Sequence, residues 1–309
     1  ANLSTGIGAK HLLYNLAEAL LDEGATIAFP APYWTTYVDI ADIVNAKILE
    51  LPCPATQDYK LTPAQLDAAL AAHKPKVFLF NNPSNPTGMV YTGEEIAALA
   101  EVLVKYPETW IITDDIYNRM LFDGLEYTNF IQVKPELRER TVFVDSLSKT
   151  YGMPGWRVGF MAGPQSVAKA VTTLHSNHNT NIPEVTTAAA IAALSGPQDV
   201  PAAKNAEFQV KRDQVLGAMQ AIPGVVCPRP QGAFYVFPDI SCAFGKSHAG
   251  VVIHNDVYFC TLPLAATGVA CVPGSAFGEP RAMRISYTCP TPQLAPGLQR
   301  NQQFFAELA

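Results

Sequence analysis

The stretch "TVFVDSLSKTYGMPGWRVGF", residues 141–160, contains an apolar run, a hydroxyl-rich turn and a second strand-like run. Lys149 lies in the middle of the turn between small polar residues, and Arg157 opens the second run. A surface lysine needs no such surroundings, whereas a lysine with a lowered pKa can act as a nucleophile toward a carbonyl group. The stretch alone leaves both interpretations open, because a motif is a hypothesis until its context agrees.

Strand-like and helix-like segments alternate on both sides of this turn. Thr62 and Thr92 are expected to begin two of the helices, and Glu95 completes a capping box with Thr92. Short apolar runs separated by helices predict an α/β domain with a mainly parallel sheet that is buried on both faces. The runs are residues 25–29, 76–81, 110–114, 141–146 and 157–163, and the helical patterns are residues 10–22, 62–73 and 92–106.

The pattern changes from about Gly196 onward. A long helix is expected over residues 204–222, and short strands are expected at residues 232–238, 268–273 and 282–287. These elements predict a smaller α+β lobe, because 309 residues are more than one compact core usually holds. We therefore expect a large domain over residues 1–198 and a small C-terminal domain over residues 199–309. Pro263 is expected to kink or break the helix around it.

Charge and composition exclude several classes of protein. The net charge of -6 argues against nucleic acid or an anionic membrane as the main partner. No apolar run approaches the roughly 20 residues of a membrane span, and no leader-like segment opens the chain. The six cysteines are scattered without a C-x-x-C pair, which disfavours a zinc site or a disulfide framework. We expect a cytoplasmic protein without a bound metal.

Polar residues follow the ends of several predicted strands. Ligands tend to bind at the carboxyl ends of parallel strands. The strand-end residues expected to line one crevice are Asn81, Asn85, Asp114, Ser146 and Lys149. Asp114 could hold the protonated ring nitrogen of a pyridoxal cofactor. The alternative is that Asp114 or Asp115 caps a helix, and that Asn85 belongs to an ordinary turn.

Three further segments could bind parts of a ligand. "STGIGAK", residues 4–10, is expected to be a small-residue loop that opens a helix, where backbone N–H groups attract phosphate, although a tight turn explains it equally well. Trp34 could stack on a flat ring or belong to the core. Arg284 lies in an apolar strand and could bind a carboxylate or form an internal salt bridge.

Five motifs occur in order over nearly the whole chain: "SNPTG", "DDIY", "SLSKTYGMPGWRVG", "GAFYVFP" and "MRISY". Together they resemble the class I/II aminotransferases, the aspartate-aminotransferase-like group of fold-type-I pyridoxal-phosphate enzymes. Within that family the chain is most similar to bacterial aspartate or prephenate aminotransferases. The resemblance implies a three-layer α/β/α large domain, a smaller α+β domain and a homodimer. It also implies ping-pong transfer of an amino group from an amino acid, aspartate or glutamate, to a 2-oxo acid.

The resemblance also implies the residue roles. Lys149 would form the internal aldimine with pyridoxal 5'-phosphate and then move the proton, and Asp114 would pair with the ring nitrogen. Tyr117 and Asn85 would bind the ring oxygen. Trp34 would stack on the ring, and Arg284 would bind the substrate carboxylate beside Asn85 and Trp34. The phosphate would be bound by Ser146, Arg157, Gly8, Ala9 and Lys10.

The resemblance leaves alternatives open. A lyase on the same scaffold would use the same cofactor residues, since both reactions start from the same covalent link. The family also has a segment before the phosphate loop that supplies part of the small domain and reaches the neighbouring subunit. We expect this segment to be missing here. A truncated chain that binds cofactor but is inactive is therefore a further alternative to the lyase.

Overall fold

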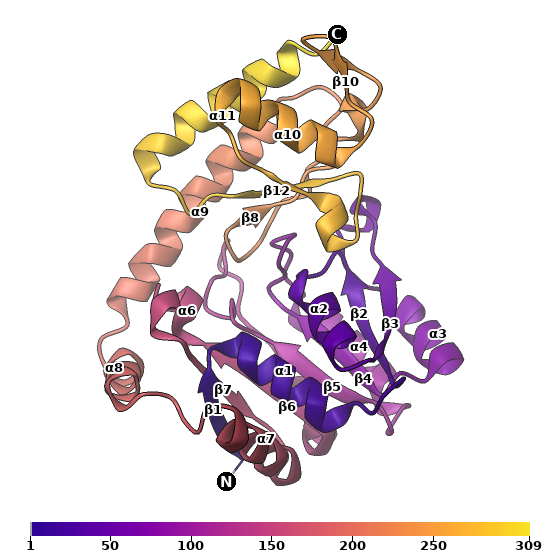
Figure 1. The fold of residues 1–309 in the computed structure, drawn as a ribbon, viewed down its shortest axis with the longest axis vertical. Coiled ribbons are helices and arrows are strands. Elements are labelled where there is room, and N and C mark those ends of the chain that lie inside the picture. Colours follow the sequence, from indigo (N-terminus) through magenta and orange to yellow (C-terminus); the bar gives the residue numbers. More distant parts are fainter. Residues whose placement is uncertain (1) are drawn as a thin grey trace.

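A computed structural model describes residues 2–309, and a seven-stranded mixed sheet forms its larger part (Figure 1). The strand order is β1-β7-β6-β5-β4-β2-β3. Strands β2 to β6 pair in parallel, whereas β7 is antiparallel to both β6 and β1. The strands are β1 (Leu3–Ile7), β2 (Thr26–Ala31), β3 (Lys47–Pro52), β4 (Val77–Asn81), β5 (Trp110–Asp114), β6 (Thr141–Ser146) and β7 (Val158–Ala162).

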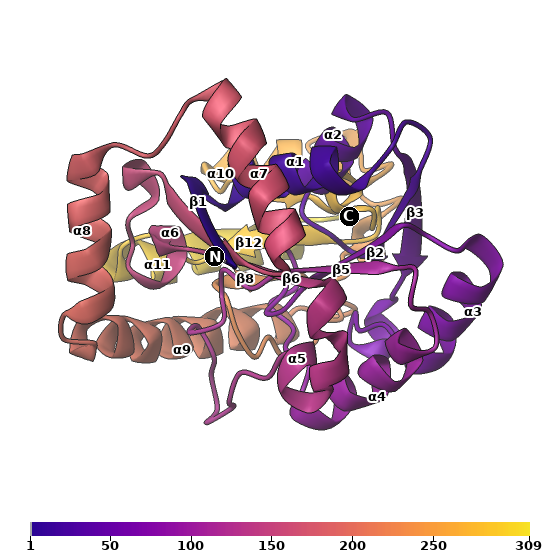
Figure 2. The same cartoon turned by 90° about the horizontal axis from the view of Figure 1, so that it is seen from below.

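Helices cover both faces of this sheet (Figure 2). Helices α1, α2 and α7 lie on one face, and α3, α4 and α5 lie on the other. The predicted three-layer α/β/α architecture with a mainly parallel sheet is therefore confirmed. The helices of this part are α1 (Ala9–Leu20), α2 (Thr36–Ile43), α3 (Pro63–His73), α4 (Gly93–Val104), α5 (Phe130–Val133), α6 (Leu147–Thr150), α7 (Gln165–His178) and α8 (Glu184–Ser195).

Local sequence explains where these elements begin and which faces they bury. Thr62 and Thr92 each accept a hydrogen bond from the backbone three residues on, and the side chain at that position bonds back, so both predicted helix starts are confirmed. Strand β5 is buried along nearly its whole length. A strand buried on both sides of a sheet needs apolar residues on both faces, and the sequence of β5 shows this pattern.

The C-terminal part has its own three-stranded antiparallel sheet, in the order β11-β12-β8. In Figure 1 this part lies above the large sheet, and α9 runs beside both. Its elements are α9 (Asp199–Gln220), β8 (Tyr235–Val236), β9 (Ser247–His248), β10 (Val251–Val252), α10 (Asp256–Thr267), β11 (Val272–Pro273), β12 (Met283–Ser286) and α11 (Thr291–Ala306). Single 3₁₀ turns occur at Ala55–Gln57, Pro135–Arg140, Pro154–Trp156, Ser241–Ala243 and Gly274–Phe277.

Two local predictions differ from the structure. Helix α10 continues through Pro263, so the expected break does not occur, because this residue is buried with Phe259 and Cys260, and their packing offsets the missing backbone hydrogen bond. The segment before α1 is not a loop throughout, since Leu3–Ile7 forms β1 along the whole length of β7. Only Gly8 separates β1 from α1. Among residues 2–309, no helix combines the length and the apolar character that a membrane span requires.

Candidate active site

A pocket of roughly 320 Å³ lies at the carboxyl ends of β4, β5 and β6. Residues from the C-terminal part close it from the opposite side, as Tyr235 and Arg284 belong to β8 and β12. The pocket brings together every predicted site residue except Gly8, which lies behind Arg157. These are Ala9, Lys10, Trp34, Asn85, Asp114, Tyr117, Ser146, Lys149, Arg157 and Arg284.

Asp114 ends β5 and points a free carboxylate oxygen into this region. Its Oδ2 accepts a hydrogen bond of 2.7 Å from the Tyr37 hydroxyl, while its Oδ1 is buried without a partner among residues 2–309. Burial raises the pKa of Asp114 to about 6, although the bond from Tyr37, a backbone N–H and the charge of Lys149 oppose the shift. Asp114 and Asp115 precede a turn at residues 116–119 and not a helix, and a backbone N–H of that turn contributes to the pKa of Asp114, so a turn-capping role stays compatible with a ligand role. An unpaired buried acceptor fits a donor such as a protonated ring nitrogen.

Lys149 lies in the short helix α6 between two aromatic rings. Its Nζ is 5.8 Å from the ring centre of Tyr117 and 5.3 Å from that of Phe234. Burial lowers the pKa of Lys149, Arg284 and Arg157 lower it further, and Asp114 opposes them. The amine is therefore neutral more often than that of a surface lysine, as a nucleophile requires.

The N-terminus of α1 and Arg157 form a cradle for an anion. Gly8 caps α1 with a φ of 80°, and a Cβ atom there would lie 2.5 Å from Nη2 of Arg157. The Arg157 guanidinium donates to the carbonyl groups of Pro154 and Ile7 at 2.9 and 3.2 Å, which holds it against the helix end. A glycine is required because any side chain would displace the arginine, and helix N–H groups beside a guanidinium suit a phosphate.

Trp34 and Ser146 also face this pocket. Trp34 packs against the core on one side and lines the pocket on the other, so neither interpretation of it excludes the other. Its ring lies 5.0 Å from Nζ of Lys10 and meets Tyr37 edge-on at 5.6 Å. Ser146 caps α6 by accepting a 3.3 Å hydrogen bond from the backbone of Ser148. The hydroxyl proton of Ser146 remains available to an anion.

Arg284 reaches the pocket from β12. Its Nη1 donates to Oδ1 of Asn85 at 3.0 Å, and its guanidinium lies between the rings of Tyr235 and Phe277 at 4.8 and 4.7 Å. It forms no salt bridge within the described residues, and its buried Nε has no partner there, so the alternative of an internal salt bridge is wrong. A guanidinium held this way fits an incoming carboxylate.

The pocket contains residues that the sequence did not single out as site residues. Tyr37 follows Trp34 by three residues and bonds Asp114, while Asn81 donates to the Asp114 carbonyl at 2.6 Å and accepts from the Asn85 backbone at 2.8 Å. Asn81 was expected at this edge as a strand-end residue, although no role was assigned to it. Tyr235 lies in the motif "GAFYVFP", but its contact with Tyr117, 118 residues away, gives no local signal.

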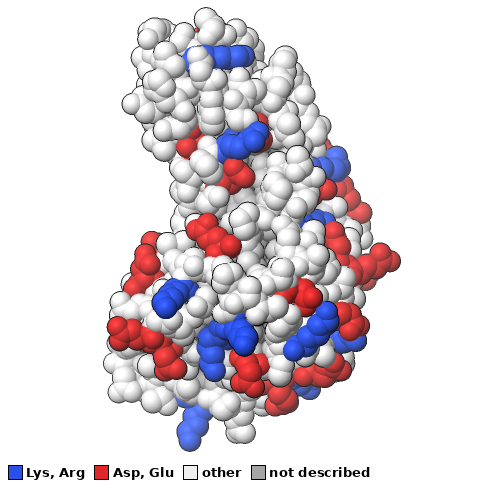
Figure 3. Space-filling model, turned by 90° about the vertical axis from the view of Figure 1, so that its right-hand side faces the viewer, with Lys and Arg blue, Asp and Glu red and all other residues white. Residues whose placement is uncertain are grey.

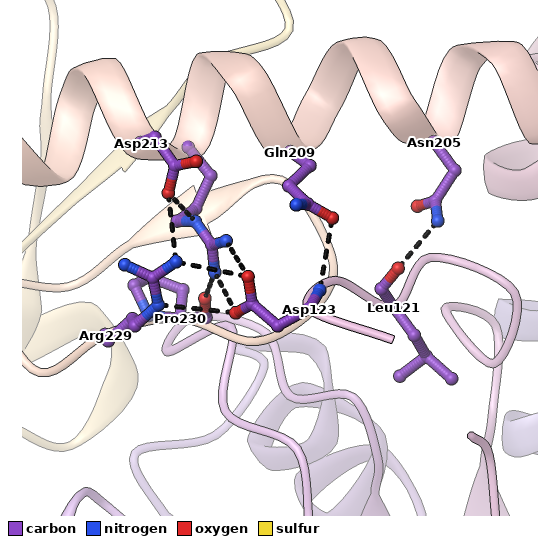
Figure 4. A network of polar contacts seen from close by, with 8 residues as sticks. Leu121, Asp123, Asn205, Gln209, Asp213, Arg229 and Pro230 are labelled. Atoms are coloured by element: carbon purple, nitrogen blue, oxygen red, sulfur yellow. Dashed lines mark hydrogen bonds and ion pairs between the residues drawn. The ribbon is translucent and has the colours of Figure 1, made fainter. Parts of the chain in front are cut away.

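A second cluster of charges lies where α9 crosses the loop after Phe122 (Figure 4). Arg212 is fully buried and donates to both carboxylate oxygens of Asp123 at 2.7 and 3.0 Å, to Asp213 at 2.7 Å, and to the Pro230 carbonyl. Arg229 bonds the same two carboxylates at 3.1 and 3.2 Å. The hydrogen bonds from Arg212 and Arg229 lower the pKa of Asp123 to about 2. We call these four residues, Asp123, Arg212, Asp213 and Arg229, the interlobe cluster.

The outer surface carries no field of a single sign on the face shown in Figure 3, where acidic and basic side chains are interspersed. This distribution gives no support to a nucleic-acid interface.

Comparison with known proteins adds independent evidence. The family model "Aminotransferase class I and II" matches residues 1–300. The aspartate/prephenate aminotransferase of Cereibacter sphaeroides is 41% identical over 310 residues, which cover 100% of this chain and 77% of that protein. The aspartate aminotransferase of Rhizobium meliloti (strain 1021) is 38% identical over 96% of this chain and 73% of its own length.

Solved structures agree with the sequence comparison. A crystal structure of the Rhizobium meliloti aspartate aminotransferase has a TM-score of 0.96 at 36% identity, and covers 100% of this chain and 77% of that one. The Thermus thermophilus aspartate aminotransferase with maleate has a TM-score of 0.87 at 28% identity, over 98% of this chain and 76% of that one. The chain thus spans about three quarters of the length of these relatives.

Proposed function

The chain belongs to the class I and II aminotransferases, as its motifs predicted, and we propose that it uses pyridoxal phosphate to move an amino group between aspartate or glutamate and a 2-oxo acid. The observation that carries the proposal is a set of buried polar groups without partners in one pocket. These groups are Oδ1 of Asp114 and Nε of Arg284, and the half-buried amine of Lys149 lines the same pocket. Native proteins rarely leave such groups unpaired, so a ligand is expected to pair them.

The pocket fits pyridoxal phosphate at each end. When bound, this cofactor supplies an aldehyde that takes up an amino group and a ring that withdraws electrons. Asp114 would accept a hydrogen bond from the ring nitrogen, and Tyr117 and Asn85 would donate to the ring oxygen. Trp34 would face the ring. The phosphate would be held by Ser146, Arg157 and the start of α1 at Gly8, Ala9 and Lys10.

Lys149 would perform the covalent and proton-transfer steps. Its neutral amine would serve as the nucleophile that holds the cofactor covalently, and its Nζ would hold and move the proton of the substrate Cα. The aromatic rings of Tyr117 and Phe234 beside it limit access of water. The positive charges of Arg284 and Arg157 keep the amine available as a base.

The charge of the pocket supports a dicarboxylate substrate. Lys10, Arg157 and Arg284 line it as cations, against the single carboxylate of Asp114. This excess of positive charge favours anionic groups such as a phosphate and the carboxylates of a substrate. Arg284 would bind the α-carboxylate while Asn85 holds its Nη1. The named activities of the relatives support aspartate as one amino donor.

We also propose the domain division and the assembly that were expected from the sequence. Residues 1–198 would bind the cofactor, and residues 199–309 would bring Arg284 to it. Exposed apolar side chains on α8, Val185, Ile191 and Leu194, support a homodimer. Six free cysteines suit the reducing cytoplasm.

The test is transfer of ¹⁵N from labelled aspartate to 2-oxoglutarate, followed by NMR of the products. We expect labelled glutamate, formed only when pyridoxal phosphate is present. Release of labelled ammonia without glutamate would indicate a lyase, and no turnover of aspartate or glutamate would indicate the inactive alternative. The comparisons favour neither alternative, since the relatives described above are aminotransferases.

A further inference from the structure

Tyr235 lies at the junction of the two lobes, and it was not predicted as a site residue. It belongs to β8, where it pairs with Ser286 of β12, and its side chain is 5% exposed. Its hydroxyl is 2.9 Å from the hydroxyl of Tyr117, and its ring faces the Arg284 guanidinium at 4.8 Å. One side chain therefore contacts both the group expected at the cofactor ring oxygen and the group expected at the substrate carboxylate.

The backbone around Tyr235 is fixed by contacts with the large lobe. Ala233 adopts a left-handed φ of 57° and donates to the Met120 carbonyl at 2.9 Å. Gly88 of the "SNPTG" motif accepts from Gly232 at 2.9 Å, and a Cβ atom on Gly88 would lie 2.8 Å from the Tyr235 carbonyl. The glycine thus lets the segment before β8, which contains Gly232, approach the large lobe closely. This arrangement sets the position of the Tyr235 hydroxyl.

We propose that Tyr235 is a positioning residue that donates its hydroxyl proton to Tyr117 and holds Arg284 with the face of its ring. The donation leaves the Tyr117 O–H for the ring oxygen of the cofactor. The inference rests on the proposed function, because it assigns Tyr235 a place in the same site. Either hydroxyl could be the donor by geometry alone, so the direction of the bond is what the proposal adds.

The consequence is a linked pair of phenols beside the reactive lysine. A phenol that accepts one hydrogen bond becomes a stronger donor for the next, because hydrogen bonds in a chain polarise one another. The charged groups around the pair are Asp114, Lys149 and Arg284. Burial raises the pKa of both tyrosines, so both stay protonated and able to donate. Without the Tyr235 hydroxyl, Tyr117 donates more weakly to the ring oxygen of the cofactor. That oxygen then keeps more negative charge, and the bound cofactor holds its titrating proton more tightly.

The first experiment is a pH titration of the visible absorption of the cofactor-loaded protein. We expect Tyr117→Phe to raise the apparent pKa at which the cofactor absorption changes. Tyr235→Phe should raise the same pKa by a few tenths of a unit, about the effect of one polarising hydrogen bond. The double variant is expected to match Tyr117→Phe alone, because both act through one oxygen. An unchanged pKa in Tyr235→Phe, or additive shifts, would overturn the proposal.

Tyr287→Phe is the matched control for the loss of a buried hydroxyl. Tyr287 is fully buried near β12, and its hydroxyl has no hydrogen-bond partner among residues 2–309. The variant Tyr287→Phe should leave the apparent pKa of the bound cofactor unchanged. A shift as large as that of Tyr235→Phe would mean that the effect is general, and would contradict the assignment.

The second experiment separates the ring of Tyr235 from its hydroxyl. Maleate binding is measured by calorimetry, with and without cofactor. Tyr235→Phe keeps the ring and should bind maleate within about twofold of the unchanged protein, whereas Tyr235→Leu should bind it about fivefold more weakly, the loss of one cation–π contact. Equal binding by the leucine variant would overturn the role at Arg284. If the unchanged protein showed no visible cofactor absorption, the proposed function would fail, while the maleate binding without cofactor would still test Tyr235.

Discussion

The pocket at the strand ends and the interlobe cluster are both built from charged side chains that lie far apart in the sequence. They differ in how those charges are paired. In the interlobe cluster, Arg212 and Asp123 satisfy one another through two hydrogen bonds. In the pocket, Asp114 Oδ1 and Arg284 Nε remain without partners among the described residues. Buried groups that pair with each other indicate a structural role, and unpaired charged groups that line one pocket indicate a ligand.

The same contrast appears in the pKa values of the two aspartates. Burial raises the pKa of Asp114 to about 6, while hydrogen bonds from Arg212 and Arg229 lower that of Asp123 to about 2. The ionised form of Asp114 therefore costs stability until a ligand pairs with it, whereas the ionised form of Asp123 contributes stability.

Replacing Lys149 with alanine should affect only the chemistry. We expect the rate of amino transfer to fall by at least about 10⁴-fold, because the variant lacks both the nucleophile and the proton carrier. Stability should not fall, since Lys149 makes no ion pair within residues 2–309. Steady-state kinetics and urea unfolding measure the two effects. Lys204→Ala, at an exposed lysine of α9, is the control, and residual turnover near the level of this control would refute the role of Lys149.

Arg212→Met should lower the stability of the fold and leave the rate of amino transfer nearly unchanged, the opposite of Lys149→Ala. Removing one partner of a buried ion pair costs roughly 3–5 kcal/mol, because the remaining carboxylates lose their donor. The free energy of unfolding in urea should fall by about this amount, and the rate of transfer in the folded protein should change by less than about threefold. Arg229→Ala is the control on the exposed side of the cluster and should cost less than about 1 kcal/mol. Equal losses for both variants would contradict the account.

Arg284→Ala should weaken substrate binding much more than cofactor binding. The loss of a desolvated charge partner is worth roughly 2–5 kcal/mol, so kcat/KM for aspartate should fall by at least about 30-fold. The dissociation constant of pyridoxal phosphate, from fluorescence titration, should stay within about threefold. A variant that lost the cofactor instead would place Arg284 in the phosphate or ring site.

Asp114→Asn and Asp123→Asn should change stability in opposite directions. The folded protein binds the Asp114 proton more tightly than the unfolded chain does, so this group lowers stability as pH rises from about 4 to 6. In the cofactor-free protein, Asp114→Asn should therefore be nearly neutral near pH 4 and stabilising by about 2–3 kcal/mol at pH 7. Urea unfolding at both pH values measures this.

Asp123 provides the matched comparison. Its lowered pKa means that its stabilisation is present above about pH 4 and is lost as pH falls through about 2. Asp123→Asn should cost about 1–2 kcal/mol at pH 7, a figure reduced for its partial exposure, and little near pH 2. If both variants destabilised the protein equally at pH 7, the distinction between the two regions would fail.

Local patterns were enough to predict much of the fold. The runs at residues 110–114 and 141–146 match β5 and β6 residue for residue, because continuous apolar runs of this length suit a buried parallel strand. Thr62 and Thr92 identified two helix starts through chemistry confined to four residues. Parallel strands place their carboxyl ends together, and that rule predicts that Asp114, Ser146 and Asn85 lie close to one another.

Features that depend on distant partners could not be predicted. Strand β1 has a polar sequence with glycine, and it forms because β7 supplies an antiparallel partner about 155 residues later. Pro263 stays helical because of packing in the C-terminal part. The bonds from Tyr37 to Asp114 and between Tyr235 and Tyr117 span 77 and 118 residues. Nothing in the local sequence around either tyrosine specifies its partner.

In the proposed function, the unpaired groups of the pocket hold pyridoxal phosphate for amino transfer. The most direct measurement is the absorption spectrum of the purified protein with pyridoxal phosphate, before and after aspartate is added, with the modified peptide identified after borohydride reduction. We expect a protein-bound visible band, a mass increase on Lys149, and loss of the band when aspartate is added. A protein that forms no bound band, or that carries the label on another lysine, would contradict the account.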